Sequence, residues 1–251
     1  MPIPVSKLSL YYLCIIGGVM VWALLLPRKR EVPGWVMEST TVFGGAFLLA
    51  SCFINLIPHT FLFGFSTPNI HIKIGAAVLA GFLIQILLEQ LTQGVEHGID
   101  NSHSSSSTMP FLGLMIGLSL HAFLEGMPLV DPDGLVHQSL FYGIILHNIP
   151  IAIVMVSLFI GKGVRPVKSI IMLLIFAIMT PLGSLCNIFL ISSDGIVQAL
   201  VMGVVVGILL HVSVSILFER GHRSFAWWKL ALIILAFVAA YFTPGCPEIY
   251  G

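Results

Sequence analysis

Residues 120–151 form two largely apolar segments joined by a short polar turn, and four polar residues stand among their apolar side chains: His121, Glu125, His147 and Asn148. An ionisable side chain at the centre of a membrane helix costs about 2.5–3.5 kcal/mol on insertion scales, so these residues call for a compensating interaction. Imidazole nitrogen and carboxylate oxygen form the mixed ligand set that suits Zn²⁺, and also Fe²⁺, Mn²⁺ or Co²⁺. The four residues therefore predict a bound divalent metal ion.

The spacing of these residues allows them to meet. His121 and Glu125 are four residues apart and share one face of a helix. A short turn at 131–134 predicts that the next helix runs antiparallel, which brings His147 to a similar depth. Pro150 lacks an N–H, so it bends the helix beside this histidine and releases a backbone carbonyl, a common way to build an ion site in a membrane. A single buried histidine is more often a hydrogen-bonded core residue, but three converging candidates favour a metal site.

The composition places these residues in a lipid bilayer. Hydrophobic residues make up 57% of the 251 residues and charged residues only 9%, and the mean hydropathy is +1.03. This is typical of an integral membrane protein. A net charge of zero, without a basic stripe that carries aromatic residues, excludes nucleic acid as a partner. The cysteines lack C-x-x-C spacing and are expected to be small core hydrophobes: Cys14, Cys52, Cys186 and Cys246.

Apolar runs of spanning length predict an all-α membrane domain over residues 1–251. The eight predicted spans are 9–27, 39–64, 70–93, 110–130, 135–160, 167–191, 195–218 and 225–243. The first run is not expected to be a cleaved signal peptide, because only Lys7 precedes it and no small-residue cleavage pattern follows it.

Basic residues predict the orientation of these spans. Of the 11 Lys and Arg residues, 9 fall in the breaks after the first, fifth and seventh spans, which lie on one side, and Lys7 and Lys73 fall on the other. Positive charge is enriched on the cytosolic side of membranes, so both termini are expected on the non-cytosolic side of a plasma or organelle membrane. The break at 94–109 is then a cytoplasmic loop, and its serine run favours a flexible linker.

Three more polar residues could line a route for metal. Asn55 and His59 lie four residues apart in the second span, where Pro58 is expected to kink the helix, and His211 lies in the seventh span. Hydrogen bonds between helices are the alternative role for all three. Glu89, near the inner end of the third span, is expected to extend its carboxylate towards the interface.

Several motifs together resemble the ZIP (Zrt/Irt-like) family of divalent-metal transporters. HAFLEG at 121–126 resembles the HxxxEG motif of the family's fourth helix, and HNIP at 147–150 resembles HNxPEG of its fifth. TPLG at 180–183 resembles the same motif of its sixth helix. The second span is similar to a stretch ending HLLPE, with Asn55 and His59 where histidine and glutamate are usual.

This resemblance implies uptake of a divalent cation, typically Zn²⁺, into the cytosol through a mid-membrane site between helices four and five. Fe²⁺, Mn²⁺, Co²⁺ and Cd²⁺ are alternative substrates, and the metal is cargo rather than a catalytic cofactor. The resemblance also implies an inverted repeat of helices 1–3 and 6–8, and one helix bundle that slides against another. The expected partners are the metal ion and the lipid bilayer, with a second copy of the chain left open.

Departures from the family pattern keep two other functions open. Ile151 replaces the glutamate of the fifth-helix motif, and Ile216 stands where a seventh-helix carboxylate is often found. The site then holds one metal with Glu125 as its only carboxylate, and two neutral histidines leave a net charge of +1. A membrane protein that binds or senses metal without transport is therefore one alternative. An intramembrane zinc hydrolase is another, but it needs a general base beyond the ligands, and no HExxH motif occurs.

Overall fold

The computed structural model describes residues 5–25, 33–63, 68–92, 108–131, 135–191, 194–218 and 227–244. Helices account for all of its regular structure in these ranges, apart from an isolated bridge between Val130 and Val136. The predicted all-α class is therefore confirmed. The α-helices are α1 Val5–Leu25, α2 Gly34–Ser51, α3 Ile57–Phe63, α4 Ile70–Thr92, α5 Thr108–Gly126, α6 Gln138–Gly161, α7 Pro166–Leu190, α8 Gly195–Phe218 and α9 Trp227–Phe242.

These helices form eight rods, because α2 continues through a π-helical turn, η1 Cys52–Leu56, into α3. In the described residues six rods are long and apolar enough to cross a membrane, and two shorter apolar helices, Lys7–Val21 and Trp227–Phe242, complete the set. Large apolar side chains such as Phe189 and Phe218 are 76% and 74% exposed. Such a surface suits lipid rather than water. Residues 94–107 of the predicted loop at 94–109 lie outside the described residues.

The π turn explains how the second rod accommodates Pro58. A proline inside a helix cannot donate the usual backbone hydrogen bond, so the residues before it must rearrange. Here the N–H of Ile57 bonds to the carbonyl of Cys52, five residues back, directly before the proline. Asn55 lies within this turn. Such π turns occur frequently at functional sites.

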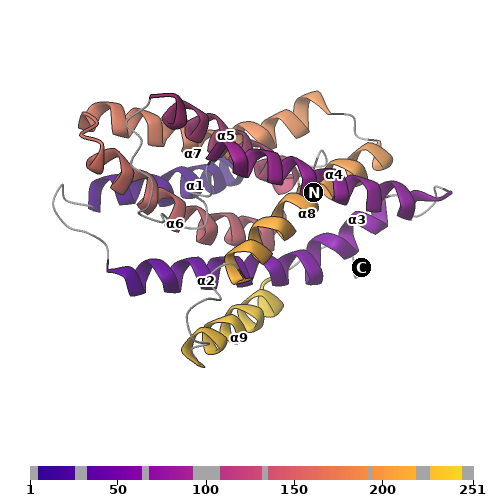
Figure 1. The fold of residues 1–251 in the computed structure, drawn as a ribbon. Coiled ribbons are helices and arrows are strands. Elements are labelled where there is room, and N and C mark those ends of the chain that lie inside the picture. Colours follow the sequence, from indigo (N-terminus) through magenta and orange to yellow (C-terminus); the bar gives the residue numbers. More distant parts are fainter. Residues whose placement is uncertain are drawn as a thin grey trace.

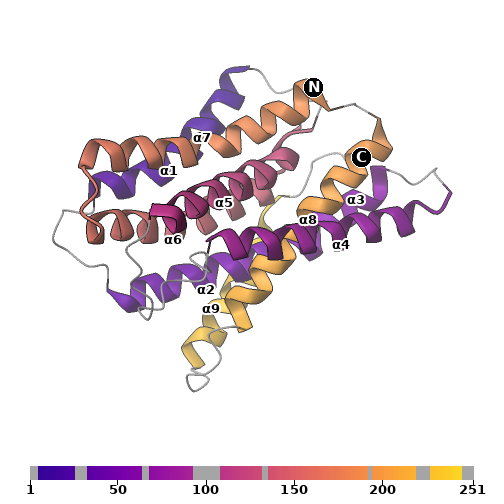
Figure 2. The same cartoon turned by 45° about the horizontal axis from the view of Figure 1, so that its top comes forward.

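The rods pack as two groups. The first comprises α1, α5, α6 and α7, which share a core that includes Val19, Leu118, Ile151 and Phe176. The second comprises α2 with α3, α4, α8 and α9: α9 packs on α2, and α4 packs on α8. Figure 1 and Figure 2 both show α4, α8 and α3 together on the side of the bundle away from α1 and α7. A further core that includes Leu48, Leu140 and Leu209 joins the two groups.

Helix α6 lies at the centre of this arrangement. Two-thirds of the α6 span, 67%, is buried, against 28% of the α4 span. After α5 a short 3₁₀ helix, η3 Met127–Leu129, leads into the turn. The inverted repeat expected for helices 1–3 and 6–8 stays a prediction.

Two glycines, one on each helix, allow α5 and α7 to cross closely. At Gly126 of α5 a Cβ would overlap the carbonyl oxygen of Thr180 in α7, and at Gly183 of α7 it would overlap the carbonyl oxygen of Phe123 in α5. Gly126 ends the HAFLEG motif and Gly183 ends TPLG. These two motifs therefore meet backbone to backbone, the way small residues bring membrane helices together. This crossing sets the position of α5 beside α7.

Candidate metal site

The predicted ligands are all buried in the interior of the bundle. His121 and Glu125 on α5 and His147 and Asn148 on α6 are all at most 2% exposed. The Nε2 atom of His121 lies 3.8 Å from Oε2 of Glu125. The rings of His121 and His147 lie 5.7 Å apart between centroids, with an angle of 74° between their planes. Two imidazoles and one carboxylate are therefore neighbours, although their ligand atoms do not all lie within 4.8 Å of one another.

A short antiparallel connection brings the two histidines to one depth. The N–H of Asp131 donates to the carbonyl of Leu135 at 2.9 Å, and the N–H of His137 donates to the carbonyl of Leu129 at 3.0 Å. His121 lies ten residues before Asp131, and His147 lies ten residues after His137. The two helices therefore run antiparallel, and the two histidines are equally far from the turn. Residues 132–134 of the predicted turn lie outside the described residues.

Two uncharged oxygen atoms of α6 lack their usual hydrogen-bond donor: the backbone carbonyl of Leu146, because of Pro150, and the side-chain Oδ1 of Asn148. Pro150 lies inside α6, where it cannot donate to the carbonyl of Leu146. Gly44 of α2 approaches that carbonyl so closely that a Cβ there would lie 3.0 Å from its oxygen. The Oδ1 atom of Asn148 is buried and has no hydrogen-bond partner within the described ranges. An uncharged oxygen in such a place is suited to a cation.

Sequence reasoning missed Gln85 of α4. This residue is fully buried, and its Oε1 lies 3.0 Å from Nδ1 of His121. Since an amide oxygen only accepts, Nδ1 is the donor, and the lone pair of the neutral ring is on Nε2, the atom that faces Glu125. A glutamine in an apolar span, four residues before Glu89 and on the same face of its helix, was the available signal.

His211 of α8 lies apart from this cluster. Its Nε2 atom lies 3.5 Å from Oε2 of Glu89 on α4, and the ring of Phe82 packs edge-on against it with 4.7 Å between centroids. Glu89 therefore does not only extend to the interface but also pairs with a histidine of the neighbouring helix. The pair provides a buried imidazole and a partly exposed carboxylate between α4 and α8.

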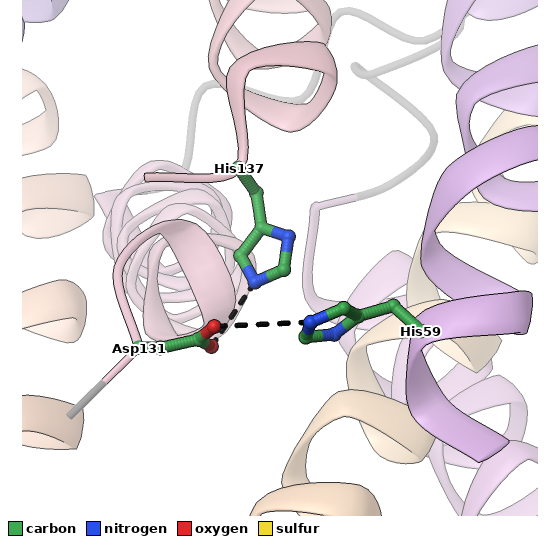
Figure 3. A group of neighbouring side chains, drawn as sticks. All are labelled: His59, Asp131 and His137. Carbon is green, nitrogen blue, oxygen red and sulfur yellow. Dashed lines mark hydrogen bonds and ion pairs between the residues drawn. The ribbon is translucent and has the colours of Figure 1, made fainter. Parts of the chain in front are cut away.

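His59 belongs to a second cluster, at the turn between α5 and α6. Its Nε2 atom lies 3.9 Å from Oδ2 of Asp131, whereas Nε2 of His137 lies 3.0 Å from Oδ1 of the same carboxylate (Figure 3). In the described part of the chain this is the only group of three metal-binding side chains whose ligand atoms all lie within 4.8 Å of one another. Sequence reasoning missed Asp131 and His137, and their places on either side of a tight turn were the only signal. Asn55, one turn before His59, is half-buried, with a buried Nδ2 that lacks a hydrogen-bond partner among the described residues.

Apolar packing fills the two positions where family carboxylates were expected. Ile151 is 1% exposed within the shared core of α1, α5, α6 and α7. Ile216 is 2% exposed, and a Cβ at Gly45 of α2 would lie 2.7 Å from its Cγ2. Neither isoleucine can bind a cation. Glu125 is thus the carboxylate of the mid-bundle cluster.

Residues 100–242, more than half of the chain, match the family described as ZIP Zinc transporter. Zinc transporter ZIP9-B of Xenopus laevis is 27% identical over 121 residues, which cover 47% of this chain and 40% of that protein. Zinc transporter ZIP9 of Xenopus tropicalis is 26% identical over the same coverage. Zinc transporter ZIP9 of Micropogonias undulatus is 27% identical over 120 residues, 46% of this chain and 39% of that protein. The chain thus spans about 40% of the length of these relatives.

Proposed function

Because the chain belongs to the ZIP zinc transporter family, we propose that it carries a divalent cation, Zn²⁺ first, across a membrane into the cytosol. Its six long apolar helices make it a multi-pass membrane protein. The observation that carries the proposal is the buried convergence of His121, Glu125 and His147 between α5 and α6. Uncompensated, this set would be costly to bury, and a divalent cation offsets that cost.

The ligands suit brief rather than permanent binding. Gln85 accepts a hydrogen bond from Nδ1 of His121 and so directs the Nε2 lone pair towards Glu125. One carboxylate and two neutral imidazoles leave a net charge of +1 around a divalent ion, which weakens binding in a low-dielectric interior. The neutral oxygen of Asn148 adds a ligand without adding charge. Such a site binds the cation and also releases it.

The proposed direction follows from the basic residues. Lys162, Arg165 and Lys168 lie at the connection from α6 to α7, which we place on the cytosolic side. The turn between α5 and α6 then faces outward, as do both termini, in a plasma or organelle membrane. Glu89 and His211 lie towards the cytosolic ends of α4 and α8, and they would bind the cation after it leaves the mid-bundle cluster for the cytosol. The whole chain acts as one transmembrane domain in lipid, alone or with a second copy of itself.

The two helix groups offer a way to alternate access. His121, Glu125 and His147 belong to the group α1, α5, α6 and α7, whereas Gln85 belongs to α4 of the other group. A sliding movement between the groups would carry the ligands across the membrane and change the partner of His121. The cation would then be exposed to one side at a time.

Zinc uptake into sealed vesicles tests the function. The purified chain is reconstituted into liposomes that enclose a fluorescent zinc indicator, and Zn²⁺ is added outside. We expect uptake by the parent chain, and background signal for Glu125→Gln and for His147→Ala, because each variant removes one ligand from the buried set. His71→Ala, which changes an exposed histidine of α4, serves as the matched control and should retain uptake. Parent-like uptake by both ligand variants would contradict this assignment.

A membrane protein that binds metal without transport is the second candidate. The observation in its favour is the burial of Ile151 and Ile216, at positions where the family usually has carboxylates. It would bind zinc but show no uptake in the vesicle experiment. Hydrolysis is not part of the proposal, because within the described residues the mid-bundle cluster offers no carboxylate beyond Glu125 to act as a base.

A further inference from the structure

The turn between α5 and α6 carries a second set of metal-binding side chains. His59, Asp131 and His137 are at most 9% exposed, so all three are buried at one end of the bundle. The two histidines direct the same atom, Nε2, at different oxygens of one carboxylate. Figure 3 shows His59 reaching the carboxylate from α3, while Asp131 and His137 come from the two sides of the turn. Two elements distant in sequence thus converge on one point.

The backbone of the turn explains why Asp131 and His137 point the same way. Val130 and Val136 form an antiparallel bridge, with Asp131 bonded to Leu135 and His137 bonded to Leu129. In such a pair, residues two apart on one strand and directly opposite on the other share a face. Asp131, Leu135 and His137 therefore lie on one face. The side-chain amide of Asn187 on α7 also donates to the carbonyl of Val130 at 3.3 Å and holds the turn in place.

The distances fit a small cation with nitrogen and oxygen ligands. Bonds of about 2.1 Å in tetrahedral geometry place neighbouring ligand atoms about 3.4 Å apart. The two distances from nitrogen to carboxylate oxygen, 3.0 Å and 3.9 Å, lie on either side of this value. The rings of His59 and His137 are 4.5 Å apart between centroids and nearly perpendicular, at 81°. The ligand atoms of the three side chains all lie within 4.8 Å of one another, and they would draw closer together to form three ligands of a tetrahedral site.

The charge of the cluster also favours a cation. The side chain of Asp131 is 5% exposed, and among the described residues the charged or titratable groups that pair with it are histidines rather than lysine or arginine. A buried carboxylate without a strong positive partner is costly. A divalent cation supplies that charge, and the two imidazoles with one carboxylate suit Zn²⁺, Co²⁺ or Fe²⁺ better than Ca²⁺ or Mg²⁺.

We propose that His59, Asp131 and His137 form a second divalent-cation site, separate from the mid-bundle cluster and closer to the outer end of the bundle. It lies ten residues from His121 along α5 and its 3₁₀ extension, and ten from His147 along α6, about 15 Å at 1.5 Å per residue. Three protein ligands leave a fourth position for water, as in sites where ligands exchange. His59 comes from one helix group and the turn from the other, so a bound cation links the two groups.

Metal binding at this site does not depend on transport. If the proposed function holds, an incoming cation would bind here before it reaches the mid-bundle cluster, and this role rests on the proposed function. The test measures bound zinc per chain in the purified, chelator-stripped protein by equilibrium dialysis and elemental analysis. We expect two Zn²⁺ per parent chain. His59→Ala and His137→Ala should each lower this to one, and Glu125→Gln should also lower it to one by removing the other site. Combining His59→Ala with Glu125→Gln should leave none.

Matched variants keep the test independent of folding. His71→Ala, on the exposed face of α4, should still bind two cations. Asp131→Asn keeps the shape of the side chain and should weaken one of the two sites at least tenfold while leaving the elution volume and helical circular dichroism unchanged. The three side chains could instead hold the turn to α3 without metal. In that case the parent would bind a single Zn²⁺ that only Glu125→Gln removes, and the proposal would be overturned.

The vesicle experiment separates this inference from the proposed function. Two bound cations without uptake would leave the second site standing and end the transport proposal. One bound cation with normal uptake would do the reverse. Competition adds a check on chemistry: a hundredfold excess of Mg²⁺ or Ca²⁺ should not displace zinc from the His59 site, whereas Co²⁺ should. Displacement by Mg²⁺ would contradict a site with two nitrogen ligands.

Discussion

At the scale of single residues, the polar side chains of the mid-bundle cluster lie beside one another. Glu125 faces an imidazole on its own helix, and that imidazole is oriented by Gln85 on another helix. A partner that orients a ligand histidine usually matters for metal affinity, since it selects the tautomer and holds the ring. The ligand set is therefore three side chains together with the amide that positions one of them.

Gln85 provides a prediction at this scale. Gln85→Ala should lower the zinc affinity of the mid-bundle cluster about tenfold to hundredfold, because His121 loses the acceptor that holds Nδ1–H. The measurement is zinc titration of the purified protein in a His59→Ala background, so that one site is observed. Gln90→Ala, at an exposed position of the same helix, is the control and should bind like the background. An unchanged affinity in Gln85→Ala would rule out the positioning role.

At the scale of helices, close backbone contacts decide the packing. At Gly81 of α4 a Cβ would overlap the carbonyl oxygen of Val204 in α8, and at Gly207 of α8 it would overlap that of Val78 in α4. This crossing repeats the arrangement of Gly126 and Gly183 between α5 and α7. Each of the two helix groups thus contains one crossing in which side chains are absent and backbones touch. Without a hydrophobic driving force in lipid, such packing is a main source of helix association.

The crossing of α4 and α8 provides a second prediction. Gly81→Ala should destabilise the protein by about 1–3 kcal/mol, because the added methyl group must push two backbones apart. Gly75→Ala on the same helix is the control, since no atom lies within 4 Å of a Cβ there. That control should be neutral or stabilising by about 0.4–1 kcal/mol. Thermal unfolding in detergent gives the comparison, and equal midpoints for the two variants would show that the close contact has no energetic role.

At the scale of the whole molecule, three polar clusters lie along the bundle. The His59 cluster lies at the turn between α5 and α6, the His121 cluster lies ten residues further along both helices, and Glu89 with His211 lies between α4 and α8. Lipid-facing apolar side chains cover the outside of the same rods. The arrangement suits a route that crosses the bundle from one end towards the other.

The orientation of this route can be tested by labelling from each side. In a cysteine-free background, Lys162→Cys lies at the connection from α6 to α7, and His71→Cys lies at the start of α4; both positions are exposed. We expect a membrane-impermeant maleimide to label position 71 from outside intact cells and position 162 only after permeabilisation, because basic residues gather on the cytosolic side. The opposite pattern would invert the predicted topology and the direction of transport with it.

The sequence by itself predicted the helices, the four candidate ligands of the mid-bundle cluster and one of the three residues of the second cluster, His59. Hydrophobic length is a local property, so the spans followed from composition, and the spacing of His121 and Glu125 followed from the helix period. The closeness of His147 followed from a short turn. These quantities depend on residues near one another in the chain, and local geometry is sufficient to predict them.

Only the tertiary structure decided which distant residues complete the sites. Gln85 reaches His121, and His59 reaches Asp131, across 36 and 72 residues of chain. Such contacts depend on how rods pack and rotate, which in turn depends on many weak contacts and on glycines such as Gly126 and Gly183. The packing also buried Ile151 and Ile216 in apolar cores. Periodicity in one helix cannot specify the facing side chain of another, because that choice is made by the whole set of helix contacts.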